Sequence, residues 1–86
     1  MRLIAHRGSM TRSLQNSPEG INLASRHGVD GVELDVICGR DGRFRCVHGP
    51  GRGTTLDDCL AAMAVTDFLI AHLKGFFSNE DLNRLA

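Results

Sequence analysis

The strict alternation of apolar and acidic residues from Val32 to Val36 constrains the fold of this chain more than any other feature. Successive side chains of a β-strand point to opposite faces, so Glu33 and Asp35 share one face. Val32, Leu34 and Val36 share the other. The segment is therefore predicted to be a strand with an apolar core on one side and two carboxylates on the other.

Further strands and helices alternate along the chain around this one. Strands are expected at residues 3–5, 44–48 and 68–74, the second of them returning after an Asp-Gly turn at residues 41–42. Helices are expected to begin after Ser17, Thr55 and Ser78, each of which is a favourable N-cap. In the second helix, Leu56, Leu60 and Met63 are spaced for one buried stripe. Alternation of this kind favours an α/β fold with roughly four strands and three helices.

Length and composition limit what the chain can be. Its 86 residues, 42% of them hydrophobic, fit a single globular domain over residues 1–86. Ten basic residues balance ten acidic ones, which argues against nucleic acid or an anionic membrane surface as the main partner. No apolar segment approaches the roughly 20 residues that a membrane-spanning helix needs. We expect a soluble, cytoplasmic protein whose three cysteines, an odd number without a CxxC pair, stay reduced.

The acidic face of the alternating strand is the first candidate for chemistry. Removing two neighbouring carboxylates from water is costly unless a cation or proton compensates. A hard divalent cation, Mg²⁺ or Ca²⁺, prefers oxygen ligands and would compensate for Glu33 and Asp35. The plainer alternative is a solvated strand face that binds nothing.

Basic residues occur where the predicted strands end. His6 and His48 follow the first and third strands, and imidazoles beside an acidic pair suit general acid–base chemistry. Arg7 could bind a phosphate through two hydrogen bonds, and Lys74, at the end of the fourth strand, is a second candidate contact. The alternative for each is an ordinary structural histidine or a solvated basic side chain.

The order and spacing of these motifs resemble those of the glycerophosphodiester phosphodiesterases. The matching motifs, spread over roughly residues 2–75, are His6-Arg7-Gly8, Pro18-Glu19, the segment 31–36, Asp41-Gly42, Val47-His48, the segment 55–58 and the strand that ends in Lys74. The resemblance implies a TIM-barrel phosphodiesterase with a divalent metal, usually Mg²⁺ or Ca²⁺. It also implies a role for each site residue: His6 and His48 as the acid/base pair, Glu33 and Asp35 as metal ligands, Arg7 and Lys74 as phosphate contacts.

The chain departs from that family in several places. Many relatives carry an acidic metal ligand two residues before the strand-end lysine, where this chain has His72; if His72 is a ligand, Mn²⁺ or Zn²⁺ becomes a better fit. Otherwise Glu33, Asp35 and water would hold Mg²⁺ weakly. Gly49 replaces a common aspartate, and the large insertion that many members carry after the matching histidine is missing.

The length raises a further question, because a closed eight-stranded barrel typically needs about 250 residues. The chain would form about half of a barrel. It could be a fragment, a homodimer whose two copies complete the barrel, or a minimal relative. The leading hypothesis is an enzyme, a phosphoric diester hydrolase that acts on small glycerophosphodiesters or related lipid-derived diesters. The alternative is a non-catalytic truncated relative that binds a metal or an anionic ligand.

Overall fold

A computed structural model describes residues 3–9, 14–49, 51–63 and 68–85 of the chain. Within them the elements follow one another as β1 (Ile4–Ala5), a 3-10 turn η1 (His6–Gly8), α1 (Pro18–Arg26), β2 (Gly31–Cys38), β3 (Phe44–Cys46), β4 (Thr54–Thr55), α2 (Leu56–Ala61), β5 (Phe68–Leu73) and α3 (Asn79–Leu85). The predicted α/β class is confirmed.

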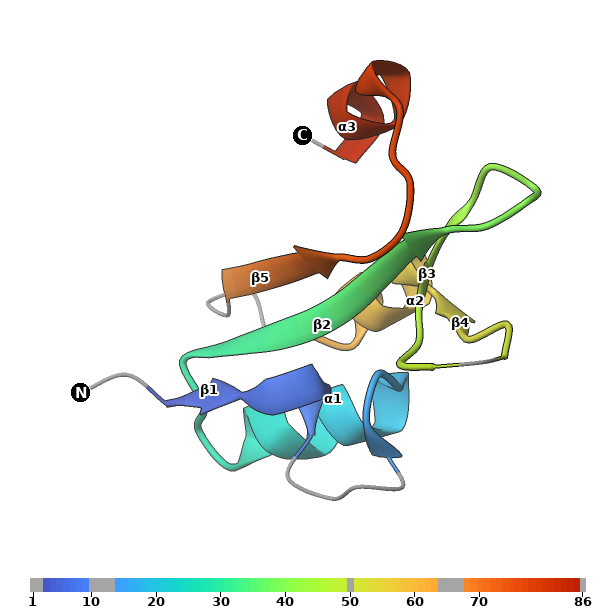
Figure 1. The fold of residues 1–86 in the computed structure, drawn as a ribbon. Helices are drawn as coiled ribbons and strands as arrows, with labels where there is room; N and C mark the ends of the chain where they lie inside the picture. The colour runs from blue at the N-terminus through green and yellow to red at the C-terminus, as the bar shows by residue number, and fades with distance from the viewer. Residues whose placement is uncertain (1–2, 10–13, 50, 64–67, 86) are drawn as a thin grey trace.

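The sheet is built around β2, its longest strand (Figure 1). β1 and β5 pair with β2 in parallel, one on each side, and β3 returns antiparallel along the carboxyl-terminal half of β2. β4 extends this hairpin by pairing with β3. The described strands therefore form an open, mixed sheet, which is compatible with part of a barrel.

The hydrophobic core lies on one face of β2, as the alternation predicts. Val32, Leu34 and Val36 are fully buried there, whereas Glu33 and Asp35 belong to the opposite face. The two helices that cover the apolar face add buried side chains to this core, namely Ile21 and Ala24 from α1 and Leu56 and Cys59 from α2. One strand thus carries both the core and the acidic pair.

The predicted helix starts are confirmed by side-chain capping. Ser17 Oγ accepts a hydrogen bond from Gly20 N at 3.1 Å, with Pro18 as the first helical residue. Thr55 Oγ1 accepts from Asp58 N at 3.3 Å. At α3, Ser78 and Asp81 cap each other's backbone N–H groups, each at 3.0 Å.

Several expected details differ in the structure. β3 ends at Cys46, so His48 lies two residues past the strand, and the two-residue strand β4 makes the count five rather than four. Of the stripe expected at Leu56, Leu60 and Met63, only Leu56 is buried: Leu60 is 40% exposed, and Met63 lies past the end of α2 and packs only partly against the core. The second buried residue of α2 is Cys59. Across the described ranges, no helix combines the length and apolar character that crossing a membrane requires.

Candidate active site

A tight turn at the end of β1 brings His6 and Arg7 over the acidic face of β2. Arg7 has a left-handed backbone (φ 55°, ψ 27°), a conformation that few residues other than glycine adopt at low cost. Gly8 follows with φ 71°, and a Cβ there would lie 2.8 Å from Ile21 Cγ1 and 2.9 Å from Leu34 Cδ2. Glycine is therefore required at this position, because the turn packs directly onto the core.

Asp35 is the centre of the polar cluster. It is 2% exposed, and three nitrogens surround its Oδ2 atom: Arg7 Nε at 3.2 Å, Asn16 Nδ2 at 3.1 Å and His48 Nδ1 at 3.4 Å. His72 Nδ1 lies 3.7 Å from the other oxygen, Oδ1. A buried carboxylate of this kind needs such compensation, and the surrounding donors supply it.

Glu33 lies beside Asp35 on the same face and is less enclosed. Its Oε1 accepts a hydrogen bond from the Arg7 backbone N–H at 3.2 Å, and His6 Nε2 lies 3.9 Å from its Oε2. The side chains of His6, His48 and His72 are each about half to two thirds exposed. Three imidazoles therefore surround the acidic pair while staying open to a ligand.

The strand register explains why His72 belongs to this group. His72 of β5 is the Cα partner of Asp35 in β2, so both side chains stand on the same face of neighbouring parallel strands. Lys74, two residues on, follows the same alternation. Its backbone N–H donates to Val36 O at 2.9 Å, but its side chain makes no hydrogen bond or ion pair with the described residues.

A cavity of about 470 Å³ opens beside this cluster. Its lining comes from η1, from the segment before α1, and from β3, β4 and the segment that joins them. It consists of Arg7, Gln15, Asn16, Ser17, Cys46, Val47, His48, Gly53 and Thr54. The volume lies in the range of small-molecule sites, roughly 300–1,000 Å³. Arg7 and His48 therefore face a space that a small substrate could enter.

The acidic pair fits a hard cation only in part. Carboxylate oxygens are suitable ligands, yet within residues 3–9, 14–49, 51–63 and 68–85 no three His, Cys, Asp or Glu side chains lie close enough together to hold a metal ion. Mg²⁺ is commonly held by one or two carboxylates and completes its shell with water and substrate phosphate oxygens. The donors present fit that mode of binding better than a closed three-residue site.

Two buried cysteines lie behind the cluster: Cys59 Sγ donates to the Asn16 backbone oxygen at 3.9 Å, and Cys46 lines the cavity. The hydrogen bond with Cys59, together with burial, raises the pKa of the Cys46 thiol far above its usual range. This thiol stays protonated at neutral pH and is a poor nucleophile. All three cysteines are free.

Sequence reasoning missed Asn16 and Gln15. Asn16 is 5% exposed; it donates to Asp35 Oδ2 and accepts at 3.0 Å from the Asp35 backbone N–H. Gln15 Oε1 accepts from Arg7 Nη1 at 3.4 Å. An asparagine just before a helix N-cap is a weak signal, because such residues usually shape the local turn.

Comparison with known proteins gives concordant matches. The family model described as "Glycerophosphoryl diester phosphodiesterase family" matches residues 6–83. Two curated proteins of Mycobacterium tuberculosis, from strains CDC 1551 / Oshkosh and ATCC 25618 / H37Rv, each named "Probable glycerophosphodiester phosphodiesterase 1", are 41% identical over 46 residues. That alignment covers 54% of this chain and 17% of either relative, so the chain matches less than a fifth of their length.

Proposed function

The chain belongs to the glycerophosphoryl diester phosphodiesterase family, and from this membership we propose that its polar cluster is a phosphodiester-hydrolysing site. The substrates would be small glycerophosphodiesters or related lipid-derived diesters. The observation that carries the proposal is the convergence of Arg7, His48 and His72 on buried Asp35, beside a cavity. Every residue of that convergence except His72 belongs to a motif that resembles the family.

His6 and His48 are the proposed acid/base pair. One takes a proton from the attacking water or substrate hydroxyl, and the other protonates the leaving alkoxide. Asp35 lies against Nδ1 of His48, which leaves Nε2 of that ring for proton transfer. His6 is held more loosely, with its Nε2 3.9 Å from Glu33.

Arg7 and Lys74 are the proposed phosphate contacts. The Arg7 guanidinium forms an ion pair with Asp35, with Nε 3.2 Å from Oδ2 but without a hydrogen bond from Nε, and its Nη1 donates to Gln15 Oε1 at the cavity wall. Its remaining donors are available to phosphate oxygens. Lys74 follows the last residue of β5 and, with no side-chain partner among the described residues, would contribute a second positive charge.

Glu33 and Asp35 are the residues that would hold a divalent cation, Mg²⁺ or Ca²⁺. When bound, such an ion polarises the phosphoryl oxygens and offsets negative charge in the transition state. His72 is the third candidate ligand, and its participation would favour Mn²⁺ or Zn²⁺.

Hydrolysis of bis(p-nitrophenyl) phosphate by the purified chain, with each of these four cations in turn, tests the proposal. We expect metal-dependent turnover that falls by about 100-fold or more in His48→Ala, because a general acid or base contributes roughly 10²–10⁴ in rate. His27→Ala is the matched control, since His27 is an exposed residue at the end of α1, outside the cluster.

Glu33→Gln should abolish the metal dependence while leaving the fold intact. Equal activity in the His48→Ala and wild-type chains would overturn the assigned role. Metal-dependent stabilisation without any turnover would instead favour the second candidate, a truncated relative that binds a cation or an anionic ligand without hydrolysing it. The partial metal site in the described part of the chain supports that candidate.

A further inference from the structure

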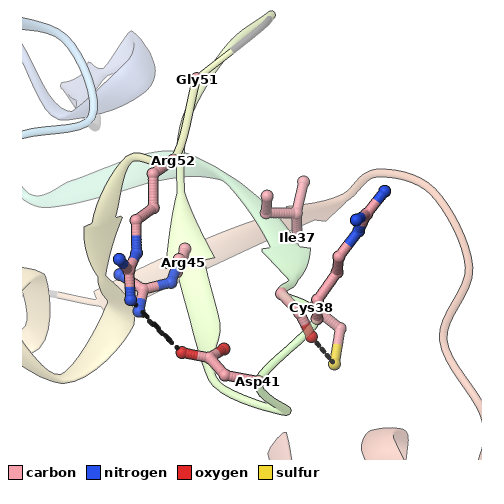
Figure 2. Close-up of a pocket in the computed structure, with 8 residues that line it drawn as sticks. Ile37, Cys38, Asp41, Arg45, Gly51 and Arg52 are labelled. Atoms are coloured by element: carbon pink, nitrogen blue, oxygen red, sulfur yellow. Dashed lines mark hydrogen bonds and ion pairs between the residues drawn. The ribbon is translucent and has the colours of Figure 1, made fainter.

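A second cavity lies at the carboxyl end of β2, just beyond Asp35, between the β2–β3 turn and the loop that precedes β4. Its volume is about 440 Å³, again within the range of small-molecule sites. Ile37 and Cys38 form one wall, Arg45 and Arg52 the opposite one, and Asp41 lies below them (Figure 2); Arg40 also lines it. We call this space the arginine cavity.

The arginine cavity opens on the same face of the sheet as the candidate active site. Ile37 follows Asp35 by two residues in β2, so the two side chains share a face. Arg45 is the Cα partner of Ile37 in the antiparallel pair, which places its side chain on that face as well. Two residues of strand separate the sites by roughly 7 Å along β2.

The charge of the cavity favours an anion. Its lining holds three guanidinium groups and one carboxylate, a net charge of +2. Arg45 and Arg52 converge on a single oxygen, Asp41 Oδ2, at 2.9 Å and 3.6 Å (Figure 2). The hydrogen bond from Arg45 lowers the pKa of Asp41, so this carboxylate is ionised at neutral pH and satisfies only part of the positive charge.

Arg45 and Arg52 differ in how far their side chains are exposed, and this difference suits ligand binding. The side chain of Arg45 is 9% exposed and fixed, whereas that of Arg52 is 77% exposed and able to close over a ligand. A guanidinium offers five donors, and among the described residues Arg45 uses its donors only toward Asp41. The planar forks of arginine suit phosphate and carboxylate groups.

We propose that the arginine cavity binds a second anionic group, a phosphate or a carboxylate, on the alcohol portion of the phosphodiester substrate. This assignment of the substrate rests on the proposed function of the neighbouring site. The diester phosphate would lie by Asp35, His48 and Arg7, and the second anion would lie between Arg45 and Arg52.

Titration of the ¹⁵N-labelled chain with inorganic phosphate, followed by amide chemical shifts, tests the binding site directly. We expect shifts at residues 37–41, 51 and 52, with affinity about three- to tenfold weaker in Arg52→Gln. Asp41→Asn should bind more tightly, because it removes the competing carboxylate while its side-chain oxygen still accepts from Arg43 N. Arg43→Gln is the matched control: it lies in the same turn, carries the same charge change and lines a different cavity.

Equal effects of Arg52→Gln and Arg43→Gln would overturn the proposal, as would shifts confined to residues around His6, Arg7 and His48.

The substrate assignment is tested with two p-nitrophenyl diesters, the 3-carboxypropyl ester and its uncharged carboxamide. We expect the carboxylate to bind more tightly in the wild type, and Arg52→Gln to abolish the difference. Equal binding of both esters by the wild type overturns the substrate assignment. These experiments measure binding and do not depend on turnover. A chain that hydrolyses no diester would therefore count against the proposed function but not against the arginine cavity as a binding site.

Discussion

Asn16 reaches the polar cluster from a different part of the chain than the motif residues. Its backbone is left-handed (φ 57°), and its side chain satisfies both the backbone N–H and the carboxylate of Asp35. Asparagine tolerates this backbone conformation better than other non-glycine residues. One residue therefore combines a sharp turn with the satisfaction of a buried charge.

Replacing Asn16 should separate these two contributions. Asn16→Ala loses both hydrogen bonds and is strained at positive φ, so we expect a loss of about 2–4 kcal/mol in the free energy of unfolding. Asn16→Gly loses the same bonds without the strain and should be about 1 kcal/mol more stable than the alanine variant. Urea denaturation of the three proteins measures this. Equal stability of alanine and glycine variants would show that the backbone conformation carries no cost.

At this scale, sequence reasoning identified the residues whose spacing carries information. The alternation of Glu33 and Asp35 and the positions of His6 and His48 at strand ends placed four groups that the structure brings together. Asn16 carries no comparable periodicity, since its role depends on how a loop folds back on β2. The chemical roles assigned to the two carboxylates and the two histidines stay predictions.

The elements were predictable where a cap or a period marks them. The three helix starts coincide with Ser17, Thr55 and Ser78, whose side chains bond the first free N–H groups. β4 was not predicted, because two residues are too few to show alternation. The buried face of α2 was misjudged for a similar reason: six residues give less than two turns, so tertiary packing decides which side is buried.

The start of α3 gives a pH-dependent prediction. Hydrogen bonds from the Ser78 backbone N–H, from Arg84 and from the Ser78 side chain lower the pKa of Asp81 to about 2, below the usual value for an aspartate. A depressed carboxyl pKa stabilises the fold above the unfolded pKa, and this contribution is lost as pH falls from about 4 toward about 2.

Asp81→Asn should therefore be less stable than the wild type at pH 5, and the difference should shrink as the pH approaches 2. Unfolding followed between pH 2 and 5 measures it. Glu80→Gln is the control, because the side chain of Glu80 makes no hydrogen bond with the described residues. A difference between wild type and Asp81→Asn that stays constant with pH would refute the ionic origin of the effect.

The whole molecule leaves apolar surface on the helix-covered side of β5. Apolar residues of α2, β5 and α3 line a groove of about 320 Å³; they are Leu56, Leu60, Leu69, Ala71, Leu73, Leu82 and Leu85. Among the described strands, β5 pairs only with β2, so it is an edge strand of the described sheet, and edge strands can pair with another chain. We propose that a second copy of the chain covers this groove and edge in a homodimer.

Light scattering coupled to size-exclusion chromatography tests the dimer. We expect Leu82→Glu, in α3, to shift the chain toward monomer, because a charge in an apolar interface is costly. Leu23→Glu in α1 is the matched control, since the two leucines are 42% and 41% exposed. If both variants and the wild type are monomers, the groove is not a dimer interface.

The overall architecture was predictable to the level of class. Alternating strands and helices indicated an α/β fold, and the strict alternation in β2 identified which side is the core. The open edges of the sheet could be covered by the rest of a longer chain or by another copy of this one. Which of these occurs depends on contacts between the sheet edges and their partner. Periodicity in one sequence does not encode such contacts.

The alternation in β2 makes the fold sensitive to the insertion or deletion of residues within this strand. Inserting or deleting one residue within Gly31–Cys38 would turn every side chain beyond it to the opposite face. The carboxylates would then enter the apolar layer, and the core residues would enter the polar cavity. Insertions tolerated by this protein should therefore accumulate in the turn after Cys38 or in the loop after His48, and β2 should keep a constant length.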